Sequence, residues 1–381
     1  MVFGSPLIEQ PEIDEVAATL KSGWISTGPR VHKFEEMFKE YKHSKYALAL
    51  NSCTAALQLS MLAIGIKEND EIIVPAMTFA ATANSVIHAG GVPVLADCNK
   101  ETMNIDPDDI QKKITAKTKA IIVVHFAGRP CNMQAIMDIA NRHNLKVIED
   151  CAHAIETEYY GIKTGRFADL GCFSFYVTKN IITGEGGMVI TDNQEYADKV
   201  KMLALHGLSQ DAWRRFSDAG YRHYQVVSAG FKYNMMDMQA AIGIHQLPRI
   251  QEYWKRRCEI WNSYNRAFEA LPLFIPHPEE PNTRHARHLY TLCLDIDNLK
   301  ITRDEFLNLM TKENIGVGVH YISLHLQPFY QKTFGYKLGD FPNAEWISRR
   351  TVSLPLSAKL NDEDVEDVIN AVKKIILRYK R

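Results

Sequence analysis

The feature of the sequence that most constrains its fold is an alternation of short β-branched runs with helical patterns between residues 46 and 205. The run at residues 120–124 is apolar at every position, as a strand buried on both faces requires. Strand–helix alternation implies right-handed crossovers and therefore a mainly parallel sheet. The predicted strands are Tyr46–Leu50, Glu71–Val74, Val92–Ala96, Ala120–Val124, Lys146–Glu149, Leu170–Ser174 and Gly187–Thr191. The predicted helices between them include Thr54–Gly65, Ala80–Ala89, Met133–His143 and Gln194–Leu205.

The pattern changes after residue 235. Residues 235–270 carry one long helical pattern, interrupted only by Gly243 and Pro248, and a proline-rich passage at 271–281 indicates a connection. The elements predicted after it are a strand at Tyr290–Ile296, a helix at Thr302–Asn314, a strand at Val317–Tyr321 and a helix at Asp362–Tyr379. We therefore expect a large domain of residues 1–250 and a smaller C-terminal α+β domain of residues 251–381.

Charge and composition exclude several classes of protein. The chain has 381 residues, and its 44 lysines and arginines against 45 aspartates and glutamates give a formal net charge of −1. Proteins that bind nucleic acid or anionic membranes usually carry a basic excess. The seven cysteines form no CxxC pair, which argues against a thiolate metal site and fits a reducing compartment. Because the chain shows neither a signal peptide nor an apolar run of ~18 residues, we expect a cytoplasmic protein without nucleic-acid, membrane or metal binding.

A hydroxyl-rich sequence, NSCTAALQL (51–59), leads from a predicted strand into a predicted helix. The first turn of that helix presents free backbone N–H groups and the hydroxyls of Ser52 and Thr54 at the positive end of the helix dipole. This arrangement predicts an anion-binding cup. The alternative is an ordinary Ser/Thr helix cap. The segment contains neither GxGxxG nor GxxxxGK[ST], so it gives little support to an NAD-linked oxidoreductase or a P-loop protein.

Two further segments carry candidate catalytic groups. Asp150 follows the predicted strand 146–149, with His153 three residues on, and the carboxyl ends of parallel strands are where open α/β sheets bind ligands. Alternatively, Asp150 caps a helix and His153 is a surface residue. Lys179 stands in an apolar and aromatic segment ahead of GEGG (184–187), whose glycines allow close approach to a ligand. Such surroundings lower the pKa of a lysine and let its amine attack an aldehyde, whereas the alternative is a solvated loop lysine.

Taken together, these three features match the needs of pyridoxal 5'-phosphate (PLP). The anion cup would bind the phosphate. Asp150 would hold the pyridine nitrogen protonated through a charge-assisted hydrogen bond, and Lys179 would bond to the aldehyde. The order of the three features along an α/β sheet supports this interpretation more than any one of them does alone.

The chain resembles, from end to end, the sugar aminotransferases of the DegT/DnrJ/EryC1/StrS family, which have the PLP-dependent transferase fold type I. That fold has a large, mainly parallel α/β domain and a smaller C-terminal α+β domain. The segments that carry the resemblance are SGWISTGPRVHKFEEMF (22–38), VPAMTFAATANSVIHAGGVPVLAD (74–97), FSFYVTKNIITGEGGMVITD (173–192), KYNMMDMQAAIG (232–243) and GVGVHYISLH (316–325).

The resemblance implies contacts to the pyridine ring of the cofactor. Phe79 matches the aromatic residue that stacks on the ring, and Asp150 matches the partner of the ring nitrogen. His153 matches a residue beside the 3-hydroxyl group. Lys179 matches the lysine that forms an aldimine with the cofactor.

The resemblance also implies contacts to the phosphate. Thr54, Ala55 and Ser174 match residues that bind it within one subunit. Asn234 matches an asparagine that reaches it from the neighbouring subunit. A homodimer with shared active sites is therefore expected.

The implied activity is that of a PLP-dependent aminotransferase, or transaminase. The resemblance implies transfer of an amino group from L-glutamate to a nucleotide-linked keto-sugar, a nucleotide-diphospho 4-keto sugar, through a pyridoxamine phosphate intermediate. His320 matches a substrate-side residue near the mouth of the cleft. Two alternatives stay open: a PLP-dependent sugar dehydratase, in whose known examples histidine replaces the lysine, and a PLP-fold regulatory protein without catalysis.

Several residues depart from the family pattern. Cys53 stands where glycine is common, so its side chain would alter the phosphate cup, and Tyr176 stands where histidine is frequent. Arg129 and Cys131, in HFAGRPCNM, have no role that follows from the sequence. The basic cluster at residues 284–288 offers a site for pyrophosphate, but we expect a solvated loop there.

Overall fold

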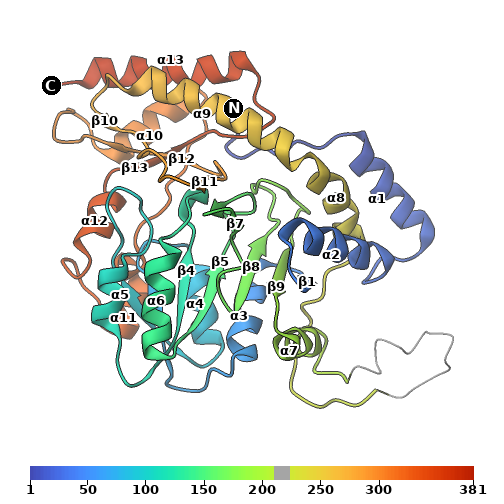
Figure 1. Ribbon diagram of the computed structural model, residues 1–381. Coiled ribbons are helices and arrows are strands. Elements are labelled where there is room, and N and C mark those ends of the chain that lie inside the picture. Colours follow the sequence, from blue (N-terminus) through green and yellow to red (C-terminus); the bar gives the residue numbers. More distant parts are fainter. Residues whose placement is uncertain (210–223) are drawn as a thin grey trace.

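The computed structural model describes residues 1–209 and 224–381, and a seven-stranded sheet forms the centre of the molecule (Figure 1). The strand order is β1-β9-β8-β5-β4-β2-β3. The pairings from β3 to β8 are parallel, whereas β9 is antiparallel to both β1 and β8. The prediction of a mainly parallel sheet is confirmed. The strands are β1 (Tyr46–Leu50), β2 (Glu71–Pro75), β3 (Val92–Ala96), β4 (Thr118–Val124), β5 (Lys146–Asp150), β8 (Leu170–Ser174) and β9 (Gly187–Thr191).

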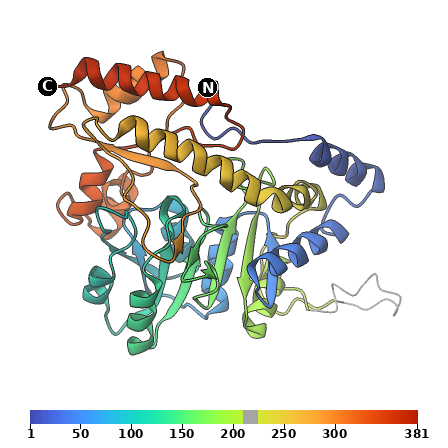
Figure 2. The same cartoon turned by 45° about the horizontal axis from the view of Figure 1, so that its top comes forward.

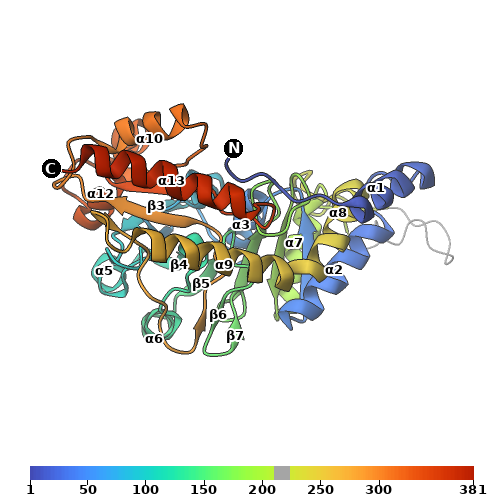
Figure 3. The ribbon, with the colours of Figure 1, turned by 90° about the horizontal axis from the view of Figure 1, so that it is seen from above.

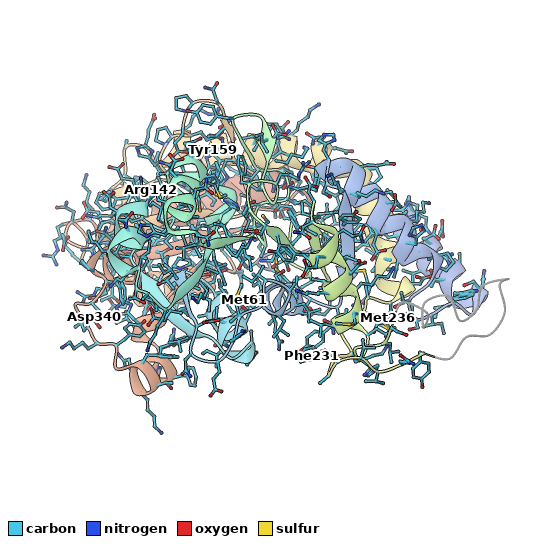
Figure 4. The ribbon with its side chains drawn as sticks, turned by 60° about the horizontal axis from the view of Figure 1, so that its bottom comes forward. Met61, Arg142, Tyr159, Phe231, Met236 and Asp340 are labelled. Atoms are coloured by element: carbon cyan, nitrogen blue, oxygen red, sulfur yellow. The ribbon has the colours of Figure 1, made fainter. Side chains whose placement is uncertain are left out.

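Helices cover both faces of this sheet because successive strand residues point to opposite sides. Ile72 and Val74 of β2 pack in one hydrophobic cluster, and Ile73 between them packs in another. The first layer contains α3 (Cys53–Ala63), α4 (Ala80–His88) and α7 (Gln194–Ala204). The second contains α2 (Pro29–Lys42), α5 (Pro107–Lys113), α6 (Met133–His143) and α8 (Asp237–Gln246). Figure 4 shows the side chains that fill these layers, with the fully buried Met61 on α3 labelled.

Two helices at the N-terminal end lie at one edge of the molecule. α1 (Gln10–Ser22) and α2 both pack against α8 (Figure 3). The carboxylate of Asp237, the first residue of α8, accepts hydrogen bonds from the N–H groups of Gly28 (2.8 Å) and Val31 (2.9 Å). The start of α8 therefore fixes the entry into α2, although the two segments are more than 200 residues apart in sequence.

A second, smaller sheet lies above the large one in Figures 1 and 2. Its strands have the antiparallel order β10-β12-β13, and α9, α10 and α13 share its hydrophobic cluster. The elements of this unit are α9 (Ile250–Phe268), β10 (Leu273–Phe274), β12 (Tyr290–Leu294), α10 (Arg303–Lys312), β13 (Thr351–Leu354) and α13 (Asp362–Tyr379). In contrast, α11 (Pro328–Phe334) and α12 (Pro342–Ser348) pack with the cluster that contains α3. The division of the chain at residue 250 stays a prediction.

Short elements complete the described chain. A third sheet has the order β11-β6-β7. Its strands and the 3₁₀ turns are β6 (Glu158–Tyr159), β7 (Ile162–Lys163), β11 (Thr283–Arg284), η1 (Phe126–Gly128), η3 (Leu247–Arg249) and η4 (Leu324–Leu326). None of the helices in the described residues is long and apolar enough to cross a bilayer. All seven cysteines are free, and six of them are buried.

Two sequence predictions need correction. The helical pattern of residues 235–270 is divided into α8 and α9 at Pro248, because proline lacks the N–H that would continue the helical hydrogen bonds. The segment Val317–Tyr321 is not a strand, and only Gly318 forms a bridge, to Ser353. β13, which the sequence did not predict, takes the place beside β12, while residues 320–321 line a cavity instead.

Candidate active site

A cavity of about 480 Å³ opens where β5 ends, a volume typical of small-molecule sites. Its walls come from the N-terminus of α3, the residues before and within α4, the end of β5, the loop after β8 and the segment 320–321. Seven of the predicted site residues line it: Thr54, Phe79, Asp150, His153, Ser174, Lys179 and His320. Ala55 and Asn234, which the sequence also predicted, do not line it.

The N-terminus of α3 forms one wall of this cavity. Ser52 is the N-cap, and its Oγ accepts a hydrogen bond from the Ala55 N–H (3.1 Å). The cap predicted as an alternative is therefore present, and Ala55 is buried behind it. Cys53 and Thr54 line the cavity, at the end of the helix where backbone N–H groups have no partner within the helix. This end of α3 can bind an anion.

Asp150 is buried at the end of β5, with 5% of its surface exposed. Its Oδ2 accepts a hydrogen bond from Thr82 Oγ1 (2.9 Å) and its Oδ1 accepts one from the Ala152 N–H (3.1 Å). Burial raises the pKa of Asp150, while these hydrogen bonds and the Lys179 charge act in the opposite direction. No ion pair to Asp150 occurs among the described residues, so a cationic group that entered the cavity would find an unpaired carboxylate.

A threonine pair orients this carboxylate, and the sequence analysis did not identify it. Thr82 lies in the first turns of α4 and donates its hydroxyl hydrogen to Asp150. The Thr78 hydroxyl is 2.8 Å from Thr82 Oγ1 and, since that proton is already donated, supplies the hydrogen between them. The block VPAMTFAAT contains both residues, but nothing in its letters shows that they face the end of β5.

Lys179 lies in the loop after β8 and lines the same cavity as the N-terminus of α3. Burial lowers the pKa of Lys179 to about 8, although nearby Cys53 and Asp150 favour its charged form. At neutral pH, roughly a tenth of such an amine is uncharged, far more than for an exposed lysine. The solvated loop lysine that the sequence left open does not describe this residue.

The glycines after Lys179 let this part of the chain pack closely against the N-terminus of α3. A Cβ on Gly187 would lie 2.4 Å from the backbone carbonyl carbon of Ser52, and one on Gly186 would lie 2.2 Å from Thr183 Oγ1. We expected the GEGG glycines to allow close approach to a ligand. In the structure, Gly187 allows close approach to the backbone of Ser52 instead. It sets the distance between Lys179 and the anion-binding end of α3.

His153 is a buried and neutral hydrogen-bond donor. Its Nδ1 accepts a hydrogen bond from the Ala127 N–H (3.3 Å), so the hydrogen of the neutral ring is assigned to Nε2. Nε2 is 3.3 Å from the hydroxyl of Tyr321. Burial moves the pKa of His153 well below its usual value, as do Lys179, His288 and His320. His153 is thus not the surface residue that one sequence alternative described.

Aromatic residues close the mouth of the cavity. Phe79 is 61% exposed although it is a large apolar side chain, and its ring centroid is 6.0 Å from that of Tyr321. An exposed aromatic face beside a cavity is suited to a flat ring. His320 donates to or accepts from Ser353 Oγ through Nδ1 (2.8 Å), and burial lowers its pKa to about 4. Tyr321 was not identified from the sequence, although it lies in the block GVGVHYISLH.

Asn234 lies in a different region of the same chain. Its Nδ2 donates to Thr27 Oγ1 (2.6 Å), and its Oδ1 accepts from Lys232 Nζ (2.6 Å). It lines a second cavity, of about 770 Å³, together with Trp24 and Glu35. One chain alone therefore does not bring Asn234 into the cavity of Lys179.

The departures from the family pattern have separate explanations. Cys53 and Tyr176 line the cavity of Lys179. Arg129 is buried and donates to Glu280 (2.7 Å) and to the carbonyl of Pro278 (3.0 Å), which ties down the proline-rich passage. Cys131 donates its N–H to His125 Nδ1 (3.0 Å).

The basic cluster at residues 284–288 is not the solvated loop that we expected. His285 and His288 are 2% and 5% exposed. The guanidinium groups of Arg284 and Arg287 stack on tryptophan rings at 3.9 and 4.5 Å from the ring centroids. Packing against α9 removes this cluster from water, a tertiary effect that a local sequence pattern does not show.

One group of potential metal ligands occurs in the described residues, at His125, Glu149 and Cys151. Glu149 accepts hydrogen bonds from the N–H groups of residues 165, 167 and 168 at 2.7–3.0 Å, and His125 Nε2 is 3.0 Å from it. His125 Nδ1 accepts from Cys131. These protein contacts occupy the ligand atoms of His125 and Glu149, so the cluster is a structural network at the end of the sheet.

Comparison with protein families gives a match over residues 6–373. The chain belongs to the DegT/DnrJ/EryC1/StrS aminotransferase family. It is 48% identical to the spore coat polysaccharide biosynthesis protein SpsC of Bacillus subtilis, over 98% of this chain and 96% of that protein. It is also 54% identical to MJ1066 of Methanocaldococcus jannaschii, over 97% of this chain and 96% of that protein.

Solved structures of sugar aminotransferases share the fold. The sugar aminotransferase Spr1654 of Streptococcus pneumoniae, described as putative and solved in its PMP form, has a TM-score of 0.93 and 30% identity, with 99% of both chains covered. PseC of Helicobacter pylori, an aminotransferase involved in the biosynthesis of pseudoaminic acid, has a TM-score of 0.91 and 29% identity over 99% of both chains. The fold is therefore that of the PLP-dependent aminotransferases, and the structural neighbours of this family member are sugar aminotransferases.

The cofactor of this family is pyridoxal 5'-phosphate, and the residues of the cavity fit it. The end of α3 presents backbone N–H groups suited to a phosphate. Asp150 is a buried carboxylate without a cation in the described residues, which suits a protonated ring nitrogen. The lowered pKa of Lys179 suits an amine that attacks an aldehyde.

Proposed function

We propose that this protein is a PLP-dependent aminotransferase that moves an amino group from L-glutamate to a nucleotide-linked 4-keto sugar. The observation that carries the proposal is that Asp150 and Lys179 line one cavity with pKa values displaced in opposite directions. Environments that separate titratable groups in this way are typical of active sites. The family and its sugar aminotransferase relatives support the choice of reaction.

Several residues in and beside the cavity have roles in holding the cofactor. Thr54, Ser174 and the N–H groups at the start of α3 bind the phosphate. Asp150 keeps a proton on the ring nitrogen, and Thr82 fixes the direction of its carboxylate. Ala55 contacts the phosphate through its backbone N–H, which donates to Ser52 Oγ when no phosphate is bound.

The remaining contacts are to the ring and its substituents. Phe79 covers one face of the ring, and the Nε2–H of His153 donates to the 3-oxygen. Lys179 Nζ would hold the aldehyde of the cofactor. His320 lies on the substrate side of the cavity.

The cofactor supplies an electron sink for the carbanion that forms when a substrate loses a proton. Because burial lowers the pKa of Lys179, a larger fraction of its Nζ is uncharged near neutral pH than for an exposed lysine, once the incoming amino group has released it. The uncharged amine would take the proton from the substrate carbon as a general base and return it, as a general acid, to the carbon on the other side of the transferred nitrogen. Since glutamate and the keto-sugar use the same groups in turn, the kinetics are ping-pong.

A second copy of the chain completes the site. Asn234 lines a different cavity within one chain, so its proposed contact to the phosphate requires a homodimer in which each site uses residues of both subunits. Such a protein acts in the biosynthesis of amino sugars, for example for a polysaccharide, as the name of the relative SpsC suggests.

The test is a screen of nucleotide-linked keto-sugars with L-glutamate, which follows the release of 2-oxoglutarate. The proposal predicts release with a 4-keto sugar and none from Lys179→Ala. A bound chromophore without amino transfer to any keto-sugar would favour the regulatory alternative. Loss of water from a sugar without consumption of glutamate would favour the dehydratase.

A further inference from the structure

A small void of about 40 Å³ adjoins Lys179, next to the main cavity. It is large enough for one water molecule. Its polar lining includes Lys179, His153, His288, His320 and Tyr321, and residues 3–4 of the N-terminal segment also line it. None of the roles assigned above uses His288, a fully enclosed histidine beside the lysine.

Asn180, the residue after Lys179, is held in one orientation. Its Nδ2 donates to Glu156 Oε2 (2.7 Å) and to the carbonyl of Ala286 (3.2 Å). Glu156 is buried and pairs with the equally buried Arg257 of α9, so it is a charged acceptor. Because both neighbours of Nδ2 can only accept, the amide cannot be reversed, and its Oδ1 is the atom that faces His288.

This orientation decides the tautomer of His288. Nδ1 of His288 is 2.9 Å from Asn180 Oδ1, which has no hydrogen, so His288 supplies it. Burial moves the pKa of His288 well below its usual value, and Lys179, His320 and Arg257 add to this effect. The ring is therefore neutral, and its Nε2, on the edge away from Asn180, carries a lone pair that can accept a hydrogen bond. Its ring centroid lies 4.4 Å from that of His153.

We propose that His288 is a positioning residue for Lys179, which holds the lysine amine through one water molecule bound in the small void. A buried water needs two to four polar partners, and Lys179, His288 and Tyr321, whose side chains all carry polar atoms, line the void. The water donates to the His288 lone pair and accepts from Lys179. The chain Arg257–Glu156–Asn180–His288 thereby connects α9 to the position of the reacting amine. This inference rests on the proposed role of Lys179.

The surroundings of Lys179 make its titration a usable measurement. The titratable groups that face it are Cys53 of α3, Asp150 of β5, and His153, His288, His320 and Tyr321. Burial keeps the three histidines neutral near pH 7, so Asp150 is the charged group among them. A change at position 288 that removes a hydrogen-bond acceptor acts on the Lys179 amine without changing a neighbouring charge.

Two variants separate positioning from simple structural support. His288→Asn keeps a donor near the Nδ1 position for the bond to Asn180 but loses the acceptor at the Nε2 position. His288→Gln places an amide near the Nε2 position, which can accept from the water, but loses the bond to Asn180. His285→Asn is the matched control, because His285 is an equally buried histidine of the same segment that does not line the void. All three keep a polar side chain of similar size.

The measurement is the pH dependence of Lys179 acetylation in the cofactor-free protein, followed by mass spectrometry of the peptide. In His288→Asn the water-mediated hydrogen bond that stabilises the charged Lys179 ammonium is lost. The midpoint of the Lys179 titration should therefore fall by about one pH unit. His288→Gln and His285→Asn should shift it by less than half as much. The rate at which each protein forms a borohydride-reducible bond with added PLP is a second readout, and it should fall only for His288→Asn.

Equal shifts in both His288 variants, a shift in His285→Asn, or an unchanged midpoint in His288→Asn would overturn the proposal. A shift confined to His288→Gln would show that only the bond to Asn180 matters, and this result would overturn it too. Failure of the proposed function is a distinct result: the unchanged protein would then form no reducible bond with PLP, while the titration of Lys179 would still report on His288.

Discussion

The two larger cavities described above differ in what one chain supplies to them. The first, of about 480 Å³, contains Asp150, whose pKa is raised, and Lys179, whose pKa is lowered. The second, of about 770 Å³, is larger and contains Trp24, Glu35 and Asn234. Trp24 is exposed there and Asn234 is hydrogen-bonded to Thr27 and Lys232, and neither side chain is an acid–base group like Asp150 or Lys179.

This difference indicates how the site is divided between subunits. The acid–base groups of the first cavity come from four segments of one chain, and the sheet and the glycines after Lys179 fix their distances. The second cavity holds a residue that we expect to act on another copy. The predictions below test this division, first at the groups within one chain and then at those between chains.

Lys179→Ala should have the largest effect. Without an amine that forms the bond to PLP and moves the proton, turnover should fall by a factor of roughly 10⁴ or more, since proton transfer alone is worth about 10²–10⁴. The measurement is 2-oxoglutarate release, with circular dichroism as the control for folding. Turnover within ten-fold of the unchanged protein would remove Lys179 from the first cavity's chemistry.

Asp150→Asn should have the next largest effect. The amide keeps the size and the hydrogen bond from Thr82 but cannot hold a proton on the ring nitrogen, so turnover should fall by about 10²-fold while the cofactor remains bound. Activity and the absorbance of bound PLP report the two quantities separately. Thr82→Val, which leaves the charge and removes only its orienting hydrogen bond, is the matched variant and should lose about ten-fold. Equal losses in both variants would contradict the assignment.

Asn234→Ala tests the second cavity. Loss of one hydrogen bond to a phosphate should weaken cofactor binding by about ten-fold. If Asn234 acts on the other subunit, mixed dimers of Asn234→Ala and Lys179→Ala chains have one site with both residues intact. Such mixtures should regain activity at low PLP, whereas each variant alone should not. No recovery in the mixture would place both residues in the same subunit's site.

Glu35→Gln should have the smallest effect on activity and should act on stability instead. Burial raises the pKa of Glu35 from 4.5 to about 7. Between these pH values the folded chain keeps the Glu35 proton, whereas the unfolded chain has released it. The folded state is therefore at full stability below pH 4.5 and loses stability as the pH rises from 4.5 through 7. Glutamine still accepts from the Ala49 N–H (2.9 Å) without ionising. Urea unfolding should show the variant more stable by about 3 kcal/mol near pH 8 and nearly unchanged near pH 4. A gain that is equal at both pH values would contradict this account.

The large sheet could be predicted from the sequence because each of its strands has a recognisable local pattern of apolar or β-branched residues. The apolar run at residues 120–124 and the β-branched run at 187–191 both lie in strands of the predicted sheet. The two antiparallel pairings of β9 were not predicted, since the direction of a strand depends on its connections. The predicted strand at residues 317–321 was wrong, because its β-branched pattern does not show that His320 and Tyr321 turn toward a cavity.

The candidate site could be predicted only where a residue's role follows from its own segment. Asp150 at a strand end and Lys179 before GEGG are of this kind. Thr82, Tyr321 and His288 act through contacts to segments 68 to 168 residues away, and no local pattern contains such distances. The resemblance to a family supplied the remaining residues of the cavity, but it did not show that Asn234 lines a different one.

The most direct test of the central claim is to identify the residue that binds PLP covalently. The purified protein is incubated with PLP, reduced with borohydride and digested, and the peptides are sequenced by mass spectrometry. The account predicts a yellow protein with one phosphopyridoxyl group per chain, attached to Lys179, and no such group in Lys179→Ala. A label on another lysine, or a colourless protein without any label, would contradict it.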